Sequence, residues 1–214
     1  MAARAAAGGG ADCAPPEADA EELRRLGRDR GLAAGLTAVL AGLDPRAVAP
    51  GGRAVLPLSA VPDDARVVPH VFADREGLAL VRWGAAGPGR GLPPERAAAL
   101  AAVRCGVLEG LLDTAVNRMA ARSFAGVPLT ELQLVQGATA DVVTVLHTAA
   151  AARPDTAPEA VAALHEQLTD AGWTVARFFG AEGYLATHPA RALHLSALTA
   201  DVWVPRTTSR EGRG

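Results

Sequence analysis

Lysine is absent from the 214-residue sequence, aromatic residues make up only 4% of it, and it has just two cysteines. A disulfide-stapled miniprotein is therefore excluded, and Cys13 and Cys105 are expected to be free thiols in a reducing cytoplasm. No apolar run reaches the roughly 18 residues that a membrane span needs, because Arg, Asp, Gln or Pro interrupts each one. Residues 1–22 hold alanine and glycine where a secretory signal needs a leucine-like core. We predict a cytoplasmic protein with no membrane partner.

A strong charge of either sign is also lacking, since the formal net charge is −2 and the sequence pI is about 6.2. Nucleic acid is therefore not an expected partner. The histidines form no pair four residues apart and have no cysteine at ligand spacing, so no metal site is predicted. They are expected at surfaces or interfaces: His70, His147, His165, His188 and His194. The three tryptophans are expected to pack in the core: Trp83, Trp173 and Trp203.

Half of the residues are hydrophobic, which is enough for one large or two small domains. Leucines recur near helical spacing over residues 21–43 and predict one or two short amphipathic helices. Proline and glycine then punctuate residues 44–94, which is typical of short strands joined by turns. The expected strands lie in residues 53–58, 65–72 and 77–83, with a hairpin turn at 74–77 between the last two.

Four longer segments with broad apolar stripes follow, at residues 95–124, 130–152, 157–180 and 189–202. Helices of this length joined by short loops predict a bundle. The expected fold class is mainly α, with a C-terminal four-helix bundle preceded by short helices and a few short β-strands. The expected divisions are a disordered tail at 1–20, a reduced helical and β region at 21–91, the bundle at 92–206 and a disordered tail at 207–214.

Two short motifs flank the predicted helices. Residues 122–133 (RSFAGVPLTELQ) end the first helix of the bundle, and residues 177–184 (RFFGAEGY) end the third. They resemble the C-terminal helical domain of acyl-CoA dehydrogenases, which carries Arg-x-x-Phe-Gly-x-x-Leu-x-x-x-Gln and Gln-x-x-Gly-Gly-x-Gly-Tyr at these places. The phenylalanine is displaced by one position, Arg177 replaces the family's glutamine and Ala181 its second glycine. The chain resembles a truncated and degenerate member over about residues 92–206.

The resemblance implies that four residues contact FAD. Arg122 would hold the pyrophosphate of a neighbouring subunit's cofactor, since a guanidinium matches phosphate oxygens in a bidentate way. Gln133 would hydrogen-bond the cofactor from the start of the second helix. Gly180 and Gly183 would let the backbone approach the dinucleotide closely, because no Cβ obstructs them.

The resemblance also implies where a catalytic base would lie. Family members remove a proton alpha to a thioester carbonyl with a carboxylate, while hydride leaves the beta carbon for the flavin. Most place this glutamate after the last helix, where the chain has Val204. A minority subgroup places it in a Leu-x-x-Glu-Arg segment opening the long helix, which residues 92–96 match after one extra residue. Glu95 is therefore either a base or a first-turn glutamate that complements the helix dipole, and we favour the second interpretation.

About 90 residues precede the bundle, where the family has two further domains, so we expect no complete acyl-CoA pocket on one chain. The leading hypothesis is a flavoprotein subunit that supports FAD-dependent α,β-oxidation of an acyl thioester. It would work in a homo-oligomer or beside a full-length acyl-CoA dehydrogenase that supplies the base and the pocket. The alternative is a non-redox helical scaffold or ligand-binding protein derived from that family. A small active dehydrogenase with Glu95 as its base is the least favoured hypothesis.

Overall fold

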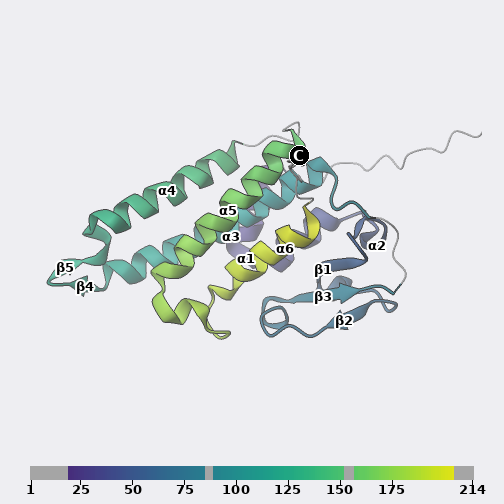
Figure 1. The fold of residues 1–214 in the computed structure, drawn as a ribbon, viewed down its shortest axis with the longest axis horizontal. Helices are drawn as coiled ribbons and strands as arrows, with labels where there is room; N and C mark the ends of the chain where they lie inside the picture. Colours follow the sequence, from purple (N-terminus) through teal and green to yellow (C-terminus); the bar gives the residue numbers. More distant parts are fainter. Residues whose placement is uncertain (1–18, 85–88, 152–156, 205–214) are drawn as a thin grey trace, which may run out of the picture.

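The computed structural model describes residues 19–84, 89–151 and 157–204. Five longer helices dominate it: α1 (Ala20–Leu40), α3 (Pro94–Ala120), α4 (Gln133–Ala150), α5 (Pro158–Phe178) and α6 (Arg191–Trp203). Figure 1 shows α3 to α6 running side by side, with a small sheet at one end and a two-stranded hairpin at the other. The predicted mainly α fold, a four-helix bundle preceded by helices and short strands, is confirmed.

Helix α1 fills the first predicted helical segment. Asp19 caps it, since its side-chain oxygen accepts a hydrogen bond from the backbone N–H of Glu22 at 2.7 Å. Gly31 interrupts the helical backbone with φ 80°, so of the one or two helices that the sequence predicts, the segment contains two helical pieces. The predicted tails at 1–20 and 207–214 lie outside the described residues, apart from the two that cap and open α1.

The small sheet has the order β1 (Arg53–Pro57), β3 (Leu78–Arg82), β2 (Arg66–Val68), with both pairs antiparallel. A 3-10 turn, η2 (Asp74–Glu76), and Gly77 at φ 68° precede the central strand β3. The predicted strands and the hairpin between the last two are therefore confirmed. The short helix α2 (Pro45–Val48) lies between α1 and β1.

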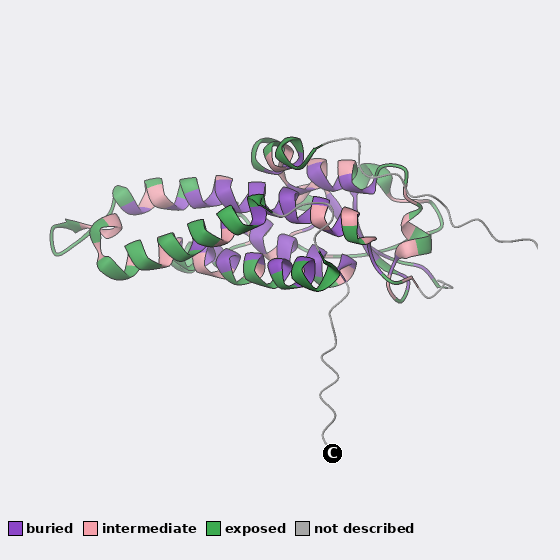
Figure 2. Ribbon diagram, turned by 90° about the horizontal axis from the view of Figure 1, so that it is seen from above, coloured by how far each residue is buried: buried purple, intermediate pink, exposed green. Residues whose placement is uncertain are grey.

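One hydrophobic core joins the sheet and the helices (Figure 2). The indole N–H of Trp203 donates to the carbonyl of Val55 in β1 at 2.8 Å, and the backbone N–H of Leu92 donates to the carbonyl of Trp203 at 2.8 Å. An ion pair of 2.7 Å between Arg191 and Glu76 connects α6 with η2. The sheet and α1 thus share one packed interior with the four helices of the bundle. No helix in the described parts of the chain is both long and apolar enough to cross a bilayer.

Helix α1 packs lengthwise on α3 with their backbones in contact. A Cβ added at Gly106 would lie 1.9 Å from the carbonyl oxygen of Arg24, and one added at Gly27 would lie 2.2 Å from the carbonyl oxygen of Val103. Gly35 is equally close to the side chain of Val103. These glycines, which look like weak points in the helical pattern, are required by the contact between the two helices.

We predict that Gly106→Ala lowers the free energy of unfolding by about 1–3 kcal/mol, because the new methyl group forces α1 away from α3. Gly137→Ala is the matched control, since Gly137 lies inside the exposed helix α4 with nothing within 4 Å of an added Cβ. That control should stabilise the protein by about 0.5–1 kcal/mol through helix propensity. Urea denaturation measures both, and a Gly106→Ala variant as stable as the parent would contradict the contact.

Candidate functional site

The end of the bundle farthest from the sheet carries the first motif. Helix α3 ends at Ala120, and the strands β4 (Ser123–Phe124) and β5 (Val127–Pro128) then form a short hairpin before α4. Arg122 lies in the turn that opens this hairpin, where its carbonyl accepts from the backbone N–H of Leu129 at 2.9 Å and its side chain is exposed. Gln133 is the first residue of α4 and is also exposed. Both residues therefore face solvent at the same end.

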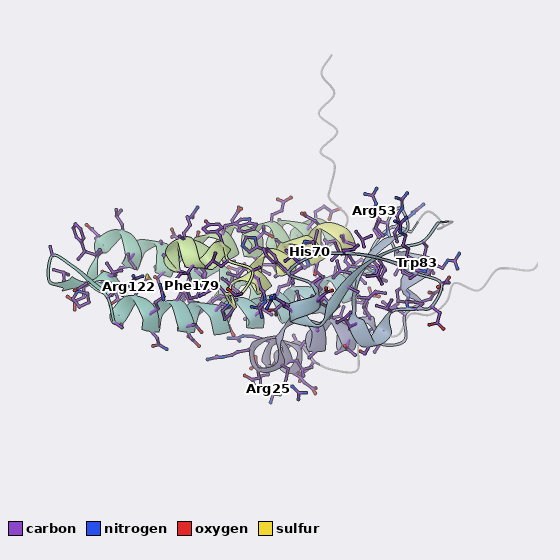
Figure 3. The ribbon with its side chains drawn as sticks, turned by 90° about the horizontal axis from the view of Figure 1, so that it is seen from below. Arg25, Arg53, His70, Trp83, Arg122 and Phe179 are labelled. Carbon is purple, nitrogen blue, oxygen red and sulfur yellow. The ribbon has the colours of Figure 1, made fainter. Side chains whose placement is uncertain are left out.

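The second motif lies beside the first. After α5 the chain turns through η4 (Gly180–Tyr184), where Glu182 forms an ion pair of 2.7 Å with Arg118 in the last turns of α3. Arg122 follows Arg118 by four residues, just beyond the end of α3, so the ion pair holds η4 against the end of the helix that leads into the first motif. Arg122 and Phe179, which precedes η4, are labelled in Figure 3. The buried Nε of Arg118 has no hydrogen-bond partner among the described residues. This end of the bundle thus presents guanidinium groups around a glycine-containing turn.

The two glycines of the turn differ in their surroundings. Gly180 has φ 64° and open space where a Cβ would stand, so it ends α5 in a left-handed conformation and leaves the backbone accessible. Gly183 is buried, and a Cβ there would lie 2.5 Å from the carbonyl oxygen of Ala176. Packing within the chain is therefore enough to require glycine at position 183. At Gly180 the space beside the backbone is free of other atoms of the chain.

The two candidate positions for a base lie at the opposite end. Glu95 is half-buried in the first turn of α3, behind Pro93 and Pro94. The hydrogen bond from Leu92 to the last residue of α6 brings that turn close to Val204. The two positions therefore lie at the same end of the bundle, but the buried Val204 side chain takes up no proton.

The length of α3 separates the two ends. Glu95 lies in the first turn of α3 and Arg122 just beyond its last residue, and the 27 residues of this helix span about 40 Å at 1.5 Å per residue. An extended flavin dinucleotide is shorter than that distance. A pyrophosphate held at Arg122 and a base at residue 95 of the same chain consequently cannot serve one cofactor.

Inside the bundle, α3, α5 and α6 meet at a buried arginine. Arg104 donates from Nε to the hydroxyl of Ser196 at 2.9 Å and from Nη2 to the hydroxyl of Thr169 at 2.7 Å. Its Nη1 donates to Nδ1 of His165 at 2.7 Å and to the carbonyl of the same residue at 3.0 Å. All of these acceptors are neutral, and burial lowers the pKa of Arg104 to about 9, opposed by the charge of Asp201. The arginine therefore remains a cation at neutral pH.

His165 is neutral because of this arrangement. A guanidinium only donates hydrogen bonds, so Nδ1 of His165 accepts, and Nε2 carries the proton that it shares with the carbonyl of Ala97 at 3.0 Å. Burial, followed by the charge of Arg104, lowers the pKa of His165 to about 3. The expectation that every histidine lies at a surface or interface is wrong for His165, which is only 3% exposed.

A groove of about 310 Å³ opens between α5 and α6 above this buried cation. Its walls include His165, Thr169 and Val204. The remaining lining residues are Ala162, Glu166, Asp170, Trp173, Ala197, Ala200 and Asp201.

A smaller cavity of about 180 Å³ lies between α1, α3 and α4. It is lined by Cys105, which is a free and buried thiol as predicted, whereas Cys13 lies outside the described residues. Burial, and next the charge of Glu109, raise the pKa of Cys105 to about 12. Glu109 itself accepts hydrogen bonds from Nε of Arg24 at 2.8 Å. The thiol is therefore protonated at neutral pH and is no nucleophile.

Sequence reasoning missed the Arg104 centre, although one signal was present. Arg104 stands in the middle of an apolar run, residues 97–108, on the helix that every other helix of the bundle contacts. A charged residue there has to be buried and hydrogen-bonded. The prediction for the tryptophans is confirmed, since Trp83 and Trp203 are fully packed and Trp173 is half-buried against the core.

Comparison with solved structures gives matches of limited extent. The chain resembles the Tcur3481-Tcur3483 steroid ACAD with a TM-score of 0.46 and 20% identity, over 72% of this chain and 45% of that one. It resembles the prolyl acyl carrier protein oxidase AnaB with a TM-score of 0.42 and 14% identity, over 64% of this chain and 45% of that one. It resembles FkbI, from the biosynthesis of a methoxymalonyl extender unit, with a TM-score of 0.42 and 23% identity, over 66% of this chain and 47% of that one. No protein-family model and no curated protein sequence matches the chain.

These solved structures are of the acyl-CoA dehydrogenase family. The chain resembles acyl-CoA dehydrogenases. The likeness concerns the arrangement of the helices, and the chain spans less than half the length of each of these three proteins.

We predict that acidification destabilises the protein through His165. Its pKa falls from about 6.5 in the unfolded chain to about 3 in the fold, so below pH 6.5 the unfolded state binds the extra proton and stability drops. The slope approaches 1.4 kcal/mol per pH unit between those values. His165→Asn keeps an acceptor oxygen near the place of Nδ1 and should flatten the profile between pH 6.5 and 5, as measured by urea denaturation. An unchanged profile would mean that folding does not lower the pKa of His165.

Proposed function

We propose that the chain is an acyl-CoA dehydrogenase-like flavoprotein subunit that holds part of an FAD shared across a subunit interface. The observation that carries the proposal is the ion pair between Arg118 and Glu182, because it holds the turn of the second motif against the end of α3, four residues before Arg122. FAD supplies hydride acceptance when bound. The residues of this chain would bind and orient its phosphates.

The groups at this end suit a pyrophosphate. Arg122 and Arg177 are exposed, and each guanidinium offers several donors in a planar fork. Arg118 keeps a buried Nε without a partner among the described residues, and Gly180 leaves its backbone open. Arg177, which stands where the family has glutamine, adds a positive charge and so can replace the lost amide donor.

Sharing the cofactor between subunits follows from the separation of about 40 Å along α3. The base and the acyl pocket next to the flavin ring would belong to the partner, a second copy or a longer acyl-CoA dehydrogenase. Large apolar side chains are exposed at the motif end, with Phe124 70% and Leu134 89% accessible. Exposed apolar surface of this kind is typical of an interface, and here it lies next to the proposed phosphate site.

A second candidate function is a non-redox scaffold built on the same bundle. Val204 in place of the usual glutamate favours it, and so does the backbone contact of Gly27 and Gly106, which leaves no room for an acyl chain between α1 and α3. The two functions differ in flavin binding. Equilibrium titration with FAD, with and without a candidate partner, therefore decides between them.

We predict that Arg122→Ala weakens FAD binding by about tenfold to a hundredfold, since a charge-assisted hydrogen bond contributes about 1.5–3 kcal/mol. The helical circular-dichroism signal should stay unchanged, because the side chain is exposed and packs no core. Arg25→Ala is the matched control, an equally exposed arginine on α1, away from the motif end (Figure 3). Flavin affinity that is identical in both variants would refute the role of Arg122.

We also predict that Glu95→Gln leaves turnover of the flavin-loaded complex within a small factor of the parent. In this role Glu95 only complements the dipole of α3, an effect of about 0.3–1 kcal/mol. Glu159→Gln is the matched control, because Glu159 occupies the same first-turn place behind a proline in α5. A loss of about a hundredfold or more in Glu95→Gln alone, with the complex and its flavin intact, would instead identify Glu95 as the base.

A further inference from the structure

The groove between α5 and α6 combines three acidic residues with apolar side chains. The lining residues on α5 recur every three or four positions from Ala162 to Trp173, along about 16 Å of the helix. This set of residues forms the α5 wall. Ala197, Ala200 and Val204 supply the apolar wall on α6. The charged lining residues are Glu166, Asp170 and Asp201, all exposed at the rim.

The groove carries three carboxylates, whereas one buried cation lies beneath it. Arg104 is the cation beneath the groove, and Asp201 acts on it through its charge. Glu166 and Asp170 stand four residues apart on α5, a spacing at which like charges repel each other. An apolar trough bordered by three carboxylates favours an occupant that carries arginine and some apolar surface.

Such a segment follows directly in the sequence. Residues 205–214 (PRTTSREGRG) begin after Val204, which itself lines the groove, and contain three arginines and one glutamate. Ten residues reach up to about 33 Å when extended, twice the length of the α5 wall. The segment is therefore long enough to turn at Pro205 and run back over the groove toward Trp173.

We propose that residues 205–214 dock in the groove between α5 and α6, with their arginine side chains on the carboxylates of the rim. The proposal does not depend on flavin binding. Docking would cover the side of Val204 that faces the groove and one side of the Trp173 ring. It would also relieve the repulsion between Glu166 and Asp170.

The fluorescence of Trp173, which lines the groove, can report whether the segment is docked. Trp173 is the partly exposed tryptophan of the three, since Trp83 is 3% exposed and Trp203 is fully buried. Acrylamide quenching of tryptophan fluorescence therefore reports mainly on the groove. We expect the triple variant Arg206→Gln/Arg210→Gln/Arg213→Gln to be quenched more strongly than the parent. About 1 M NaCl should have the same effect on the parent, because the Debye length then falls to about 3 Å.

The matched control removes three exposed arginines elsewhere, Arg25→Gln/Arg30→Gln/Arg53→Gln, and should be quenched like the parent. In a Trp173→Phe background the difference between the parent tail and its triple variant should vanish. Equal quenching of the parent and the triple variant at low salt would overturn the proposal. Protection of Trp173 that rises with protein concentration would also overturn it, because the occupant would then be the segment of a second copy.

Discussion

The contact between α1 and α3 determines how the rest of the molecule is arranged. Glycines at positions 27 and 106 let the two backbones meet, so α1 takes a place against the bundle. The stretch of α3 from Arg96 to Glu109 is thereby enclosed, with α1 on one flank and α5 and α6 on another. Any polar group on α3 in this middle stretch has to find its partners inside the protein. The space that α1 occupies is closed to a ligand.

Arg104 shows how that requirement is met. Its donors are distributed over neutral acceptors on α5 and α6, which fixes both helices against α3 and keeps His165 unprotonated. A buried cation without a carboxylate among its hydrogen-bond partners makes acidic residues favourable nearby, and Asp201 fulfils that role at the groove. The buried cation and the groove above it are thus coupled, because the charge of Asp201 in the groove acts on Arg104.

The two ends of α3 divide the chemistry that the resemblance implies. The groups that we propose to bind phosphate lie at the hairpin end with Arg122, whereas the two candidate positions for a base, Glu95 and Val204, lie at the sheet end. A rigid helix of about 40 Å between them favours a cofactor shared with a second subunit. Exposed apolar side chains beside Arg122 fit the same arrangement. This arrangement is the reason for proposing a supporting subunit and not a self-sufficient enzyme.

The sequence by itself determined the helices, the strands and the two motifs, because periodicity, proline and glycine act within a few residues of one another. It also indicated Val204 in place of a base. Only the tertiary structure decided that Gly106 is a contact point, that His165 is buried, and that Gly183 is needed for packing. The partners of Arg104 lie 61 to 92 residues away along the chain, so no local pattern records them. Burial and charge at these positions arise only when distant segments pack together.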